Sequence, residues 1–320
     1  MTNNILYSII TPVYNRADCI LRCMESVSAQ QNLDEIEHVI VDDGSQDDTS
    51  TVVEEYASKH PHIQFIKFPQ NRGTNAARNA AICTARGKWC VILDSDDYFV
   101  NDALGIIRKT MDENPGYRHY MFAPDDMQAN YQENPILRGT EQKVLTFQDF
   151  LSGDVAGDFI HVCNTEILRR HPFDERLRVY EGTFFLMFFR EAQQMLFTNH
   201  VVTIRERSRG DSVTRDVIRT NAASIRRNCL SLETRLQYFA EDLRQLGMPR
   251  RLHAIQMDLY DNYLLLGLYR EASALGIDRF ATRREKLLHC ICVLRLGWSY
   301  RLALQSYLWL KYSLFKTKLK

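Results

Sequence analysis

The sequence has no net charge, no paired-cysteine motif and no long apolar run. Its 40 Lys and Arg balance its 40 Asp and Glu, so charge gives no indication of a nucleic-acid partner. The eight cysteines form no CxxC pair, so we interpret them as reduced thiols of a cytosolic protein and expect no metal site built from them. No apolar stretch approaches the length of a transmembrane helix, and the polar Met1–Asn4 predicts no secretory signal.

Two phosphate-binding motifs are also missing after the first predicted strand, Tyr7–Thr11. That strand continues into Pro12-Val13-Tyr14-Asn15 and not into a GxGxxG turn, which argues against a dinucleotide-dependent dehydrogenase. The same junction lacks the glycine-rich basic loop that is typical of nucleotidyltransferases. The length of 320 residues leaves room for one large domain or two modest ones.

Carboxylates follow two of the predicted strands. Val91–Leu93 is an apolar run typical of a strand buried on both faces, and it leads directly into Asp94–Asp97. His38–Val41 ends in the same way at Asp42-Asp43. The carboxyl edge of such a parallel sheet is where ligands bind. Crowded carboxylates need a positive charge nearby, which Mg²⁺ or Mn²⁺ bound to a substrate phosphate would supply; a solvated acidic turn is the alternative.

The N-terminal two thirds alternate between predicted strands and helices, which indicates a parallel sheet with helical crossovers. We expect Asp18 to cap the first helix and the polar stretch 127–145 to be a loop or lid over the binding site. From Thr220 onward, apolar residues recur every three to four positions and predict helices only, including Leu252–Leu268 and Arg279–Lys320.

Four segments resemble motifs of glycosyltransferase family 2, the inverting enzymes of the GT-A fold. They are SIITPVYNR (8–16), VIVDDGSQDDT (39–49), NRGTNAARNAA (71–81) and VILDSDD (91–97). The resemblance implies an α/β GT-A fold with a mostly parallel central sheet over residues 1–215. Residues 1–100 would then bind the nucleotide sugar and residues 101–215 the acceptor, while 216–320 form a helical C-terminal region.

The resemblance assigns the nucleotide base to the end of the first strand. Pro12, Val13 and Tyr14 would line the base pocket, with the Tyr14 ring stacked on the base at a gain of roughly 1–3 kcal/mol. Asp43 would accept the N3–H of a uracil ring. Asp42 would bind the ribose or support the turn. The alternative for Tyr14 is an ordinary aromatic residue at a strand end.

Asp94, Ser95, Asp96 and Asp97 match the Asp-x-Asp motif of the family. The resemblance places Asp94 at the ribose, Ser95 among the donor-binding residues and Asp96 on Mn²⁺ or Mg²⁺. Asp97 would take either the donor or the metal role. A cation is useful there because the departing nucleoside diphosphate gains negative charge as the sugar C1–O bond breaks.

Four arginines are candidates for the base or the diphosphate. Arg72 and Arg78 belong to the third motif, and Arg207 and Arg209 lie on a basic loop resembling the one that closes over the diphosphate in the family. For Arg78, a solvated helix residue is the alternative. Arg207 and Arg209 could equally belong to a solvated charged loop.

The acceptor-side motif departs from the family at one position. The family has Glu-Asp before an aromatic-rich helix, with Asp as the catalytic base, whereas this chain has Glu181-Gly182. Glu181 is therefore the predicted base, and a structural carboxylate at a helix start is the alternative. The fallback bases are Asp174, Glu175, Asp125, Asp126 and His161. A non-catalytic nucleotide-sugar-binding or scaffold subunit of a polysaccharide assembly system is the rival function.

The C-terminal end is basic and aromatic. From Arg283 to Lys320 there are nine Lys and Arg and one acid, Glu285. Aromatic residues beside Lys and Arg suit a helix on an anionic bilayer, although a packing helix with a solvated basic tail is the alternative. We expect a cytoplasmic protein, peripheral on the inner face of the membrane, that uses a glycan or lipid-linked oligosaccharide acceptor in bacterial surface-polysaccharide assembly.

Overall fold

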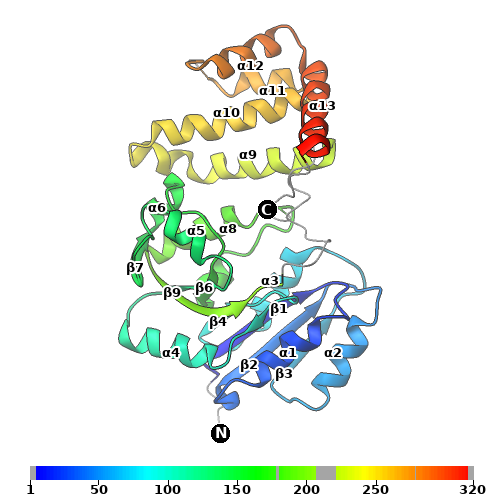
Figure 1. Cartoon of the computed structure of the whole chain (residues 1–320), viewed down its shortest axis with the longest axis vertical. Helices are drawn as coiled ribbons and strands as arrows, with labels where there is room; N and C mark the ends of the chain where they lie inside the picture. The colour runs from blue at the N-terminus through cyan, green and yellow to red at the C-terminus, as the bar shows by residue number, and fades with distance from the viewer. Residues whose placement is uncertain (1–4, 178–179, 207–220, 278, 316–320) are drawn as a thin grey trace. The chain divides into compact units, whose positions relative to one another are not determined.

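The structure is a computed structural model that describes residues 5–177, 180–206, 221–277 and 279–315, with side chains described to residue 308. The chain divides into two compact units, Met1–Arg209 and Gly210–Lys320, and each is described by itself (Figure 1). Their boundary falls inside 207–220, outside the described residues. The expected boundary at 215 and the division of the first unit at 100 therefore stay predictions.

The first unit is built on one mixed sheet of nine strands over the described residues. The order is β3-β2-β1-β4-β8-β6-β9-β5, and β7 pairs with β9. The strands are β1 Tyr7–Val13, β2 Ile36–Asp42, β3 Ile63–Lys67, β4 Trp89–Ile92, β5 Tyr98–Phe99, β6 His119–Pro124, β7 Gln142–Thr146, β8 Ile160–Asn164 and β9 Gln194–Ile204. β1 to β4 pair in parallel, β8 runs antiparallel between β4 and β6, and β6 pairs in parallel with β9. This architecture confirms the expected α/β class.

The register of the parallel strands brings the acidic segments to one edge. Every residue of β1 and β2 is buried, because helices cover both faces of this part of the sheet. Val13 pairs with Asp42, and Ile10 pairs with Ile92 at the end of β4. The chain therefore leaves β1, β2 and β4 on the same side of the sheet, which is the ligand-binding edge of such folds.

The helices of the first unit are α1 Ile20–Ser28, α2 Thr49–Ala57, α3 Thr74–Thr84, α4 Ala103–Glu113, α5 Gln128–Glu133, α6 Phe147–Ser152, α7 Thr165–Arg170 and α8 Gly182–Ala192, with a 3₁₀ turn at Leu33–Glu35. α3 packs on β1 and β2. Its small side chains Ala76, Ala77 and Ala81 are buried and allow a close approach to the sheet. Thr146 and Asp149 form a reciprocal capping box at the start of α6.

Two local predictions were wrong. Asp18 does not cap α1, whose N-cap is Cys19 and carries no side-chain cap bond. The stretch 127–145 is not a simple loop, because it contains α5 and most of β7. Tyr131 and Leu145 anchor these two elements, with 1% and 0% of their surfaces exposed. Isolated apolar residues in a polar stretch gave no periodic signal, so the sequence pattern missed both elements.

The second unit is helical throughout its described residues, as expected. Its helices are α9 Ala222–Gln245, α10 Pro249–Leu266, α11 Tyr269–Ala274, α12 Arg283–Val293 and α13 Gly297–Phe315. They enclose a separate core that includes Cys229, Tyr260, Leu264 and Leu288. The segment predicted as one helix from Arg279 is interrupted between α12 and α13, where Arg295 adopts a φ of +55°. Within the described chain, no helix is both long and apolar enough to cross a membrane.

Candidate active site

The acidic turn after β4 lies at the carboxyl edge of the sheet. Its backbone is closed by the Asp97 N–H, which donates to the Asp94 carbonyl over 3.0 Å. The Asp94 side chain is half exposed and that of Asp96 is partly exposed, whereas Asp97 is buried. Asp97 accepts a hydrogen bond from the Glu206 N–H at 3.1 Å. The turn thus offers two accessible carboxylates and hides the third.

Crowding changes the ionisation of the buried acid. Burial, with the nearby charges of Asp94 and Asp96 next in size, raises the pKa of Asp97 to about 8. A carboxyl group in this position favours its neutral form until positive charge arrives. The turn therefore has an electrostatic demand for positive charge.

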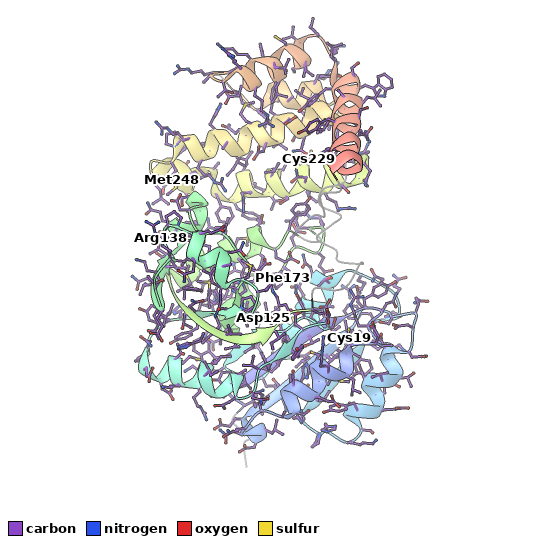
Figure 2. All side chains as sticks on the ribbon, in the orientation of Figure 1. Cys19, Asp125, Arg138, Phe173, Cys229 and Met248 are labelled. Carbon is purple, nitrogen blue, oxygen red and sulfur yellow. The ribbon has the colours of Figure 1, made fainter. Side chains whose placement is uncertain are left out.

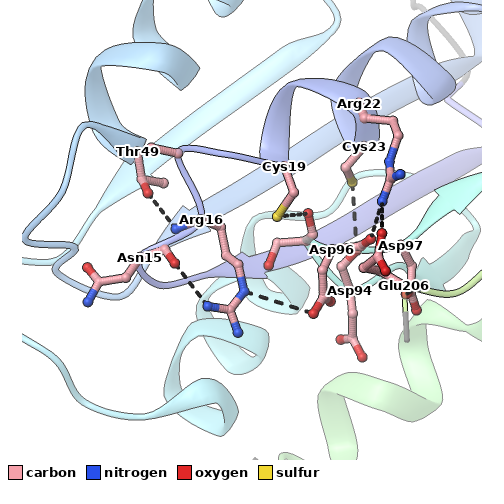
Figure 3. A network of polar contacts seen from close by, with 12 residues as sticks. Asn15, Arg16, Cys19, Arg22, Cys23, Thr49, Asp94, Asp96, Asp97 and Glu206 are labelled. Atoms are coloured by element: carbon pink, nitrogen blue, oxygen red, sulfur yellow. Dashed lines mark hydrogen bonds and ion pairs between the residues drawn. The ribbon is translucent and has the colours of Figure 1, made fainter. Parts of the chain in front are cut away.

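Two arginines that the sequence reasoning did not assign partly meet this demand (Figure 3). The Nε of Arg16 lies 3.9 Å from Oδ2 of Asp96. Arg22, on α1, donates to the Asp96 carbonyl at 3.2 Å and pairs with Glu206 at 3.3 Å. Its guanidinium also stacks 4.3 Å above the Tyr98 ring. Arg16 ends the first motif and could have been suspected, but Arg22 had no signal beyond its charge.

The two acids at the end of β2, Asp42 and Asp43, have separate structural roles. Both oxygens of the buried Asp43 accept backbone N–H bonds, from Arg72 at 2.6 Å and from Gly73 at 2.8 Å. Asp42 accepts from the Ser45 N–H at 2.9 Å and from the Ser50 hydroxyl. Asp42 therefore supports the turn, while the Asp43 carboxylate is fixed in orientation and keeps lone pairs for a further donor.

The residues predicted for the base pocket lie beside this turn. Pro12 and Val13 are buried in β1, and Tyr14 is partly exposed just beyond it. The Asp43 N–H donates to the Val13 carbonyl at 2.8 Å, which joins the ends of β1 and β2. The structure thus places Pro12, Val13, Tyr14 and Asp43 together.

Arg78 connects the acidic turn to the acceptor-side motif. From α3 its Nη2 donates to Oδ1 of Asp94 at 3.1 Å, and its Nη1 donates to Oε1 of Glu181 at 2.7 Å. The side chain is nearly buried, and its guanidinium lies 5.5 Å from the centre of the Phe173 ring. Arg78 is therefore not a solvated helix residue; it is the charged link between Asp94 and Glu181.

α3 also holds the segment that precedes Glu181. The Asn79 amide donates to the Phe173 carbonyl and accepts from the Phe173 N–H, at 2.9 and 2.8 Å. Asn75 donates to the carbonyls of Asp174 and Leu177 at 3.0 and 2.9 Å. The third motif thus positions the acceptor-side motif through three side chains, two of them asparagines that the sequence reasoning left without a role.

Glu181 is the N-cap residue of α8, and its side chain is partly exposed. Arg78 engages only Oε1, and Oε2 has no hydrogen-bond partner among the described residues. α8 is the expected aromatic-rich helix, with Phe184, Phe188 and Phe189 buried. Glu181 therefore combines a fixed orientation with one oxygen that is open to a proton donor.

Most of the fallback bases are committed to other partners. Asp174 pairs with Arg176 at 2.6 Å, which lowers its pKa, and Glu175 pairs with Arg72 at 3.2 Å. Arg205 binds the other two carboxylates. Its backbone N–H donates to Asp125 at 3.0 Å, and its guanidinium pairs with Asp126 at 2.7 Å. Figure 2 labels Asp125 and Phe173 among the side chains of the first unit.

His161 faces a different environment from the other fallback bases. Its Nδ1 lies 3.0 Å from Nε2 of the buried His119, and its ring stacks on Phe185 with 4.0 Å between centroids. Burial lowers the pKa of both histidines, that of His161 to about 3, so both rings are neutral at pH 7. Arg207 and Arg209 lie outside the described residues.

The residues present fit a divalent cation that arrives with a phosphate ligand. In the described part of the chain, no three His, Cys, Asp or Glu side chains converge into a metal cage. Mg²⁺ and Mn²⁺ sites of this kind use one or two carboxylates and complete the shell with substrate phosphates and water. Asp96 offers an accessible carboxylate for that purpose.

Comparison with known proteins agrees with this geometry. Residues 8–171, about half of the chain, match the family "Glycosyl transferase family 2". A curated relative from Campylobacter jejuni, a GalNAc(5)-diNAcBac-PP-undecaprenol beta-1,3-glucosyltransferase, is 26% identical over 210 residues, which cover 65% of this chain and 66% of that protein. Matches to three other curated relatives cover only 14 to 26% of their lengths.

Two solved structures share the fold. Staphylococcus aureus TarS 1–349 in complex with UDP-GlcNAc superposes with a TM-score of 0.65 at 18% identity, covering 95% of this chain and 91% of TarS. The mannosyltransferase PcManGT from Pyrobaculum calidifontis, in complex with GDP-Man and Mn²⁺, gives 0.55 at 21% identity, covering 94% of this chain and 84% of that one. The chain belongs to glycosyltransferase family 2, and its first unit has the expected GT-A-like fold.

Proposed function

We propose that this protein is a glycosyltransferase that moves a sugar from a uridine-diphosphate donor to a hydroxyl of a glycan or lipid-linked acceptor, with inversion at the sugar carbon. The observation that carries this proposal is the Arg78 link, which joins Asp94 of the predicted donor site to Glu181 of the predicted acceptor site. Both groups needed for the transfer are thereby held at one edge of the sheet.

The donor base would lie between Tyr14 and Asp43. Asp43 is an acceptor-only group whose orientation is fixed by two backbone amides, so it suits the single N3–H donor of uracil. TarS was solved with UDP-GlcNAc, which supports uracil, whereas PcManGT was solved with GDP-Man and keeps guanine as the alternative. The sugar itself would be selected by residues around the acidic turn.

Departure of the nucleoside diphosphate needs positive charge beside the phosphates. A divalent cation held by Asp96, with Asp97 beside it, would stabilise the charge that develops on the leaving group. Arg16 lies beside Asp96, and Arg78 holds the Asp94 carboxylate in a single orientation. The protein groups thus prearrange the site before the donor binds, which is the form of electrostatic stabilisation that costs no reorganisation.

The acceptor hydroxyl must lose a proton as it attacks the sugar carbon from the face opposite the leaving group. We assign this proton to Oε2 of Glu181, because Arg78 occupies Oε1 and fixes the carboxylate. The same ion pair is compatible with a purely structural Glu181. In that case the protein would bind nucleotide sugar without turnover, which is the scaffold function.

Calorimetric titration with UDP, GDP and TDP, each with and without Mn²⁺, tests the donor half of the proposal. We expect Mn²⁺-dependent binding of UDP that Asp96→Ala weakens by about tenfold or more, the cost of losing a charged metal ligand. Asp174→Ala is the control, because this carboxylate pairs with Arg176 outside the acidic turn. Equal binding by wild type and Asp96→Ala would remove Asp96 from the metal site, and binding of no nucleotide would refute the donor site.

The proposed acceptor and cellular location follow from relatives and composition. The Campylobacter relative is named for an undecaprenol-linked acceptor, which supports a lipid-linked oligosaccharide here. A protein that uses such an acceptor would work at the inner face of the cytoplasmic membrane. Radiolabelled sugar transfer to membrane extracts, compared between wild type and Glu181→Gln, would detect the acceptor and separate a transferase from a scaffold.

A further inference from the structure

The second unit exposes several large apolar side chains on α12, on α13 and in the turn between these helices. We call it the α12–α13 patch: Leu287, Val293, Leu294, Leu296, Trp298 and Leu302. Trp298 is 72% exposed, and Val293 and Leu294 are 65% and 64% exposed. A tryptophan left this open to water is unusual, because its ring is among the largest apolar surfaces a residue can bury.

Hydrogen bonds fix the backbone of the turn that carries the patch. The Leu296 N–H donates to the Ile291 carbonyl at 2.9 Å. The Tyr269 hydroxyl donates to the Arg295 carbonyl at 2.8 Å and accepts from the Gly297 N–H at 2.9 Å. These bonds pin the turn to α11, so its backbone is satisfied while its side chains face outward.

Arg295 occupies the tip of this turn in a left-handed conformation, with φ of +55°. Glycine is the usual residue at such a position after a helix, because any side chain there meets the backbone. The chain carries an exposed arginine instead, in the middle of the apolar patch. Arg295 therefore places a positive charge here although its side chain makes the left-handed backbone less favourable than a glycine would.

The charges along the segment that carries the patch have one sign. Lys286, Arg295 and Arg301 lie within or beside it, and residues 286–308 contain no Asp or Glu. The nearest acid along the chain, Glu285, is engaged in the capping box at the start of α12. In the sequence of α13, Arg301 and Lys311 are the charged residues among nineteen. An apolar surface with a basic rim complements the acyl boundary and the anionic headgroups of a lipid bilayer.

We infer that the α12–α13 patch docks the protein on an anionic bilayer, with Trp298 and Leu294 inserted at the headgroup level and Arg295 and Arg301 on the lipid phosphates. A second copy of the chain is a poorer occupant. In a two-fold contact through this patch, Arg295 and Arg301 would lie opposite the same arginines of the second copy. The patch segment has no acid that could pair with them. The inference does not depend on glycosyl transfer, because it concerns helices outside the first unit.

Flotation of the full chain with vesicles tests the inference directly. We expect binding to vesicles of phosphatidylcholine mixed with phosphatidylglycerol, little binding to phosphatidylcholine alone, and release at high salt. The double variant Leu294→Ser/Trp298→Ser should bind the anionic vesicles about tenfold or more weakly, because it loses two inserting side chains. Leu246→Ser is the matched control, since Leu246 is 39% exposed in the same unit but outside the patch.

The variant Arg295→Gly distinguishes the effect of the positive charge on vesicle binding from any effect on folding stability. It relieves the left-handed strain, so the melting temperature should hold or rise while anionic-vesicle binding falls about fivefold, the share of one basic residue. Wild type that stays off anionic vesicles, or a double variant that floats like wild type, would overturn the inference. So would a dimer in light scattering that the double variant dissociates, because that result assigns the patch to a second copy. UDP titration of the same variants should be unchanged, which keeps this test distinct from that of the proposed function.

Discussion

Arg78 and Glu181 form an ion pair of 2.7 Å between residues 103 positions apart in the sequence. The same guanidinium bonds Asp94 at 3.1 Å, so one side chain carries two carboxylates from two motifs. Burial of Arg78 opposes its charge, and the two carboxylates more than offset that effect, so its pKa is raised above the ordinary value. The geometry of the site therefore depends on a planar fork with two donating nitrogens.

Arg78→Lys tests this dependence. A lysine keeps the charge but cannot hold two carboxylates in a fixed fork, so we expect turnover to fall about 10- to 100-fold. The unfolding free energy should fall by about 1–3 kcal/mol, because a nearly buried charged network is broken. Arg244→Lys, whose partner Glu241 is exposed in the second unit, is the control and should change neither quantity. Full activity in Arg78→Lys would show that the link has no part in catalysis.

The variant Glu181→Gln distinguishes a role of Glu181 as the catalytic base from a purely structural role at the start of α8. The amide keeps the size of the side chain and can still accept the Arg78 bond, but it cannot take a proton. If Glu181 is the base, turnover falls about 10²- to 10⁴-fold while UDP affinity stays within about twofold. Glu175→Gln is the matched control, since Glu175 pairs with Arg72 on the surface. Retained turnover in Glu181→Gln would move the base to His161 or one of the other carboxylates.

Gly44→Ala should damage the turn that presents Asp43. Gly44 has a φ of +74°, and a Cβ there would lie 2.6 Å from the backbone carbon of Gln70. We expect a loss of about 1–3 kcal/mol in unfolding free energy and weaker UDP binding, because Gln70 precedes the residues that orient Asp43. Gly139→Ala is the control: its φ of +68° is similar, but open space surrounds it. Equal costs for both variants would mean that the close approach at Gly44 is unimportant.

Buried histidines predict a loss of stability in acid. Burial lowers the pKa of His38 and His161 to about 3, and that of His119 well below the ordinary 6.5. In the unfolded chain these rings protonate near 6.5, so the unfolded state binds more protons as the pH falls from about 6.5 towards 3. The contribution of these histidines to stability is therefore complete above pH 6.5 and declines below it, by about 1.4 kcal/mol per pH unit for each histidine.

Urea unfolding at pH 7.5 and pH 5.5, followed by near-UV circular dichroism, measures this decline. His119→Phe should make it shallower, because the substitution removes one proton-binding group and keeps an aromatic ring against Phe188 and Phe189. His200→Gln is the control, since His200 is exposed. An unchanged decline in His119→Phe would assign the acid sensitivity to other groups, such as the Glu191 carboxylate that pairs with Arg170 and His171.

Local sequence pattern was sufficient to predict that two acidic segments share one edge of the sheet. The strands ending at Asp42 and Asp94 were predictable because each is an apolar run that stops at acidic residues, and parallel pairing then places both ends together. The long strand β9 went unrecognised. Polar residues interrupt its apolar pattern, and its place in the sheet depends on pairing with β6, β7 and β5.

The contacts that Arg78 and Arg22 make within the site could not be predicted from the sequence, for a different reason. Arg78 sits in a motif of alanines and asparagines, where it resembles a solvated helix residue until the fold brings Glu181 to it. Arg22 reaches the acidic turn from a helix face that carries no motif. The α12–α13 patch was visible as composition, but its exposure required knowledge of which side chains the helical core takes in.

The asparagines of α3 restrict how this protein can be recombined with its relatives. Asn75 and Asn79 bond the backbone of 173–177, so the helix beside the proposed donor site also holds the segment that leads to the proposed acceptor site. A chimera joined near residue 100 would transplant one side of these bonds without the other. A chimera that exchanges donor specificity would therefore have to take both α3 and the segment from residue 173 to Glu181 from the same parent protein.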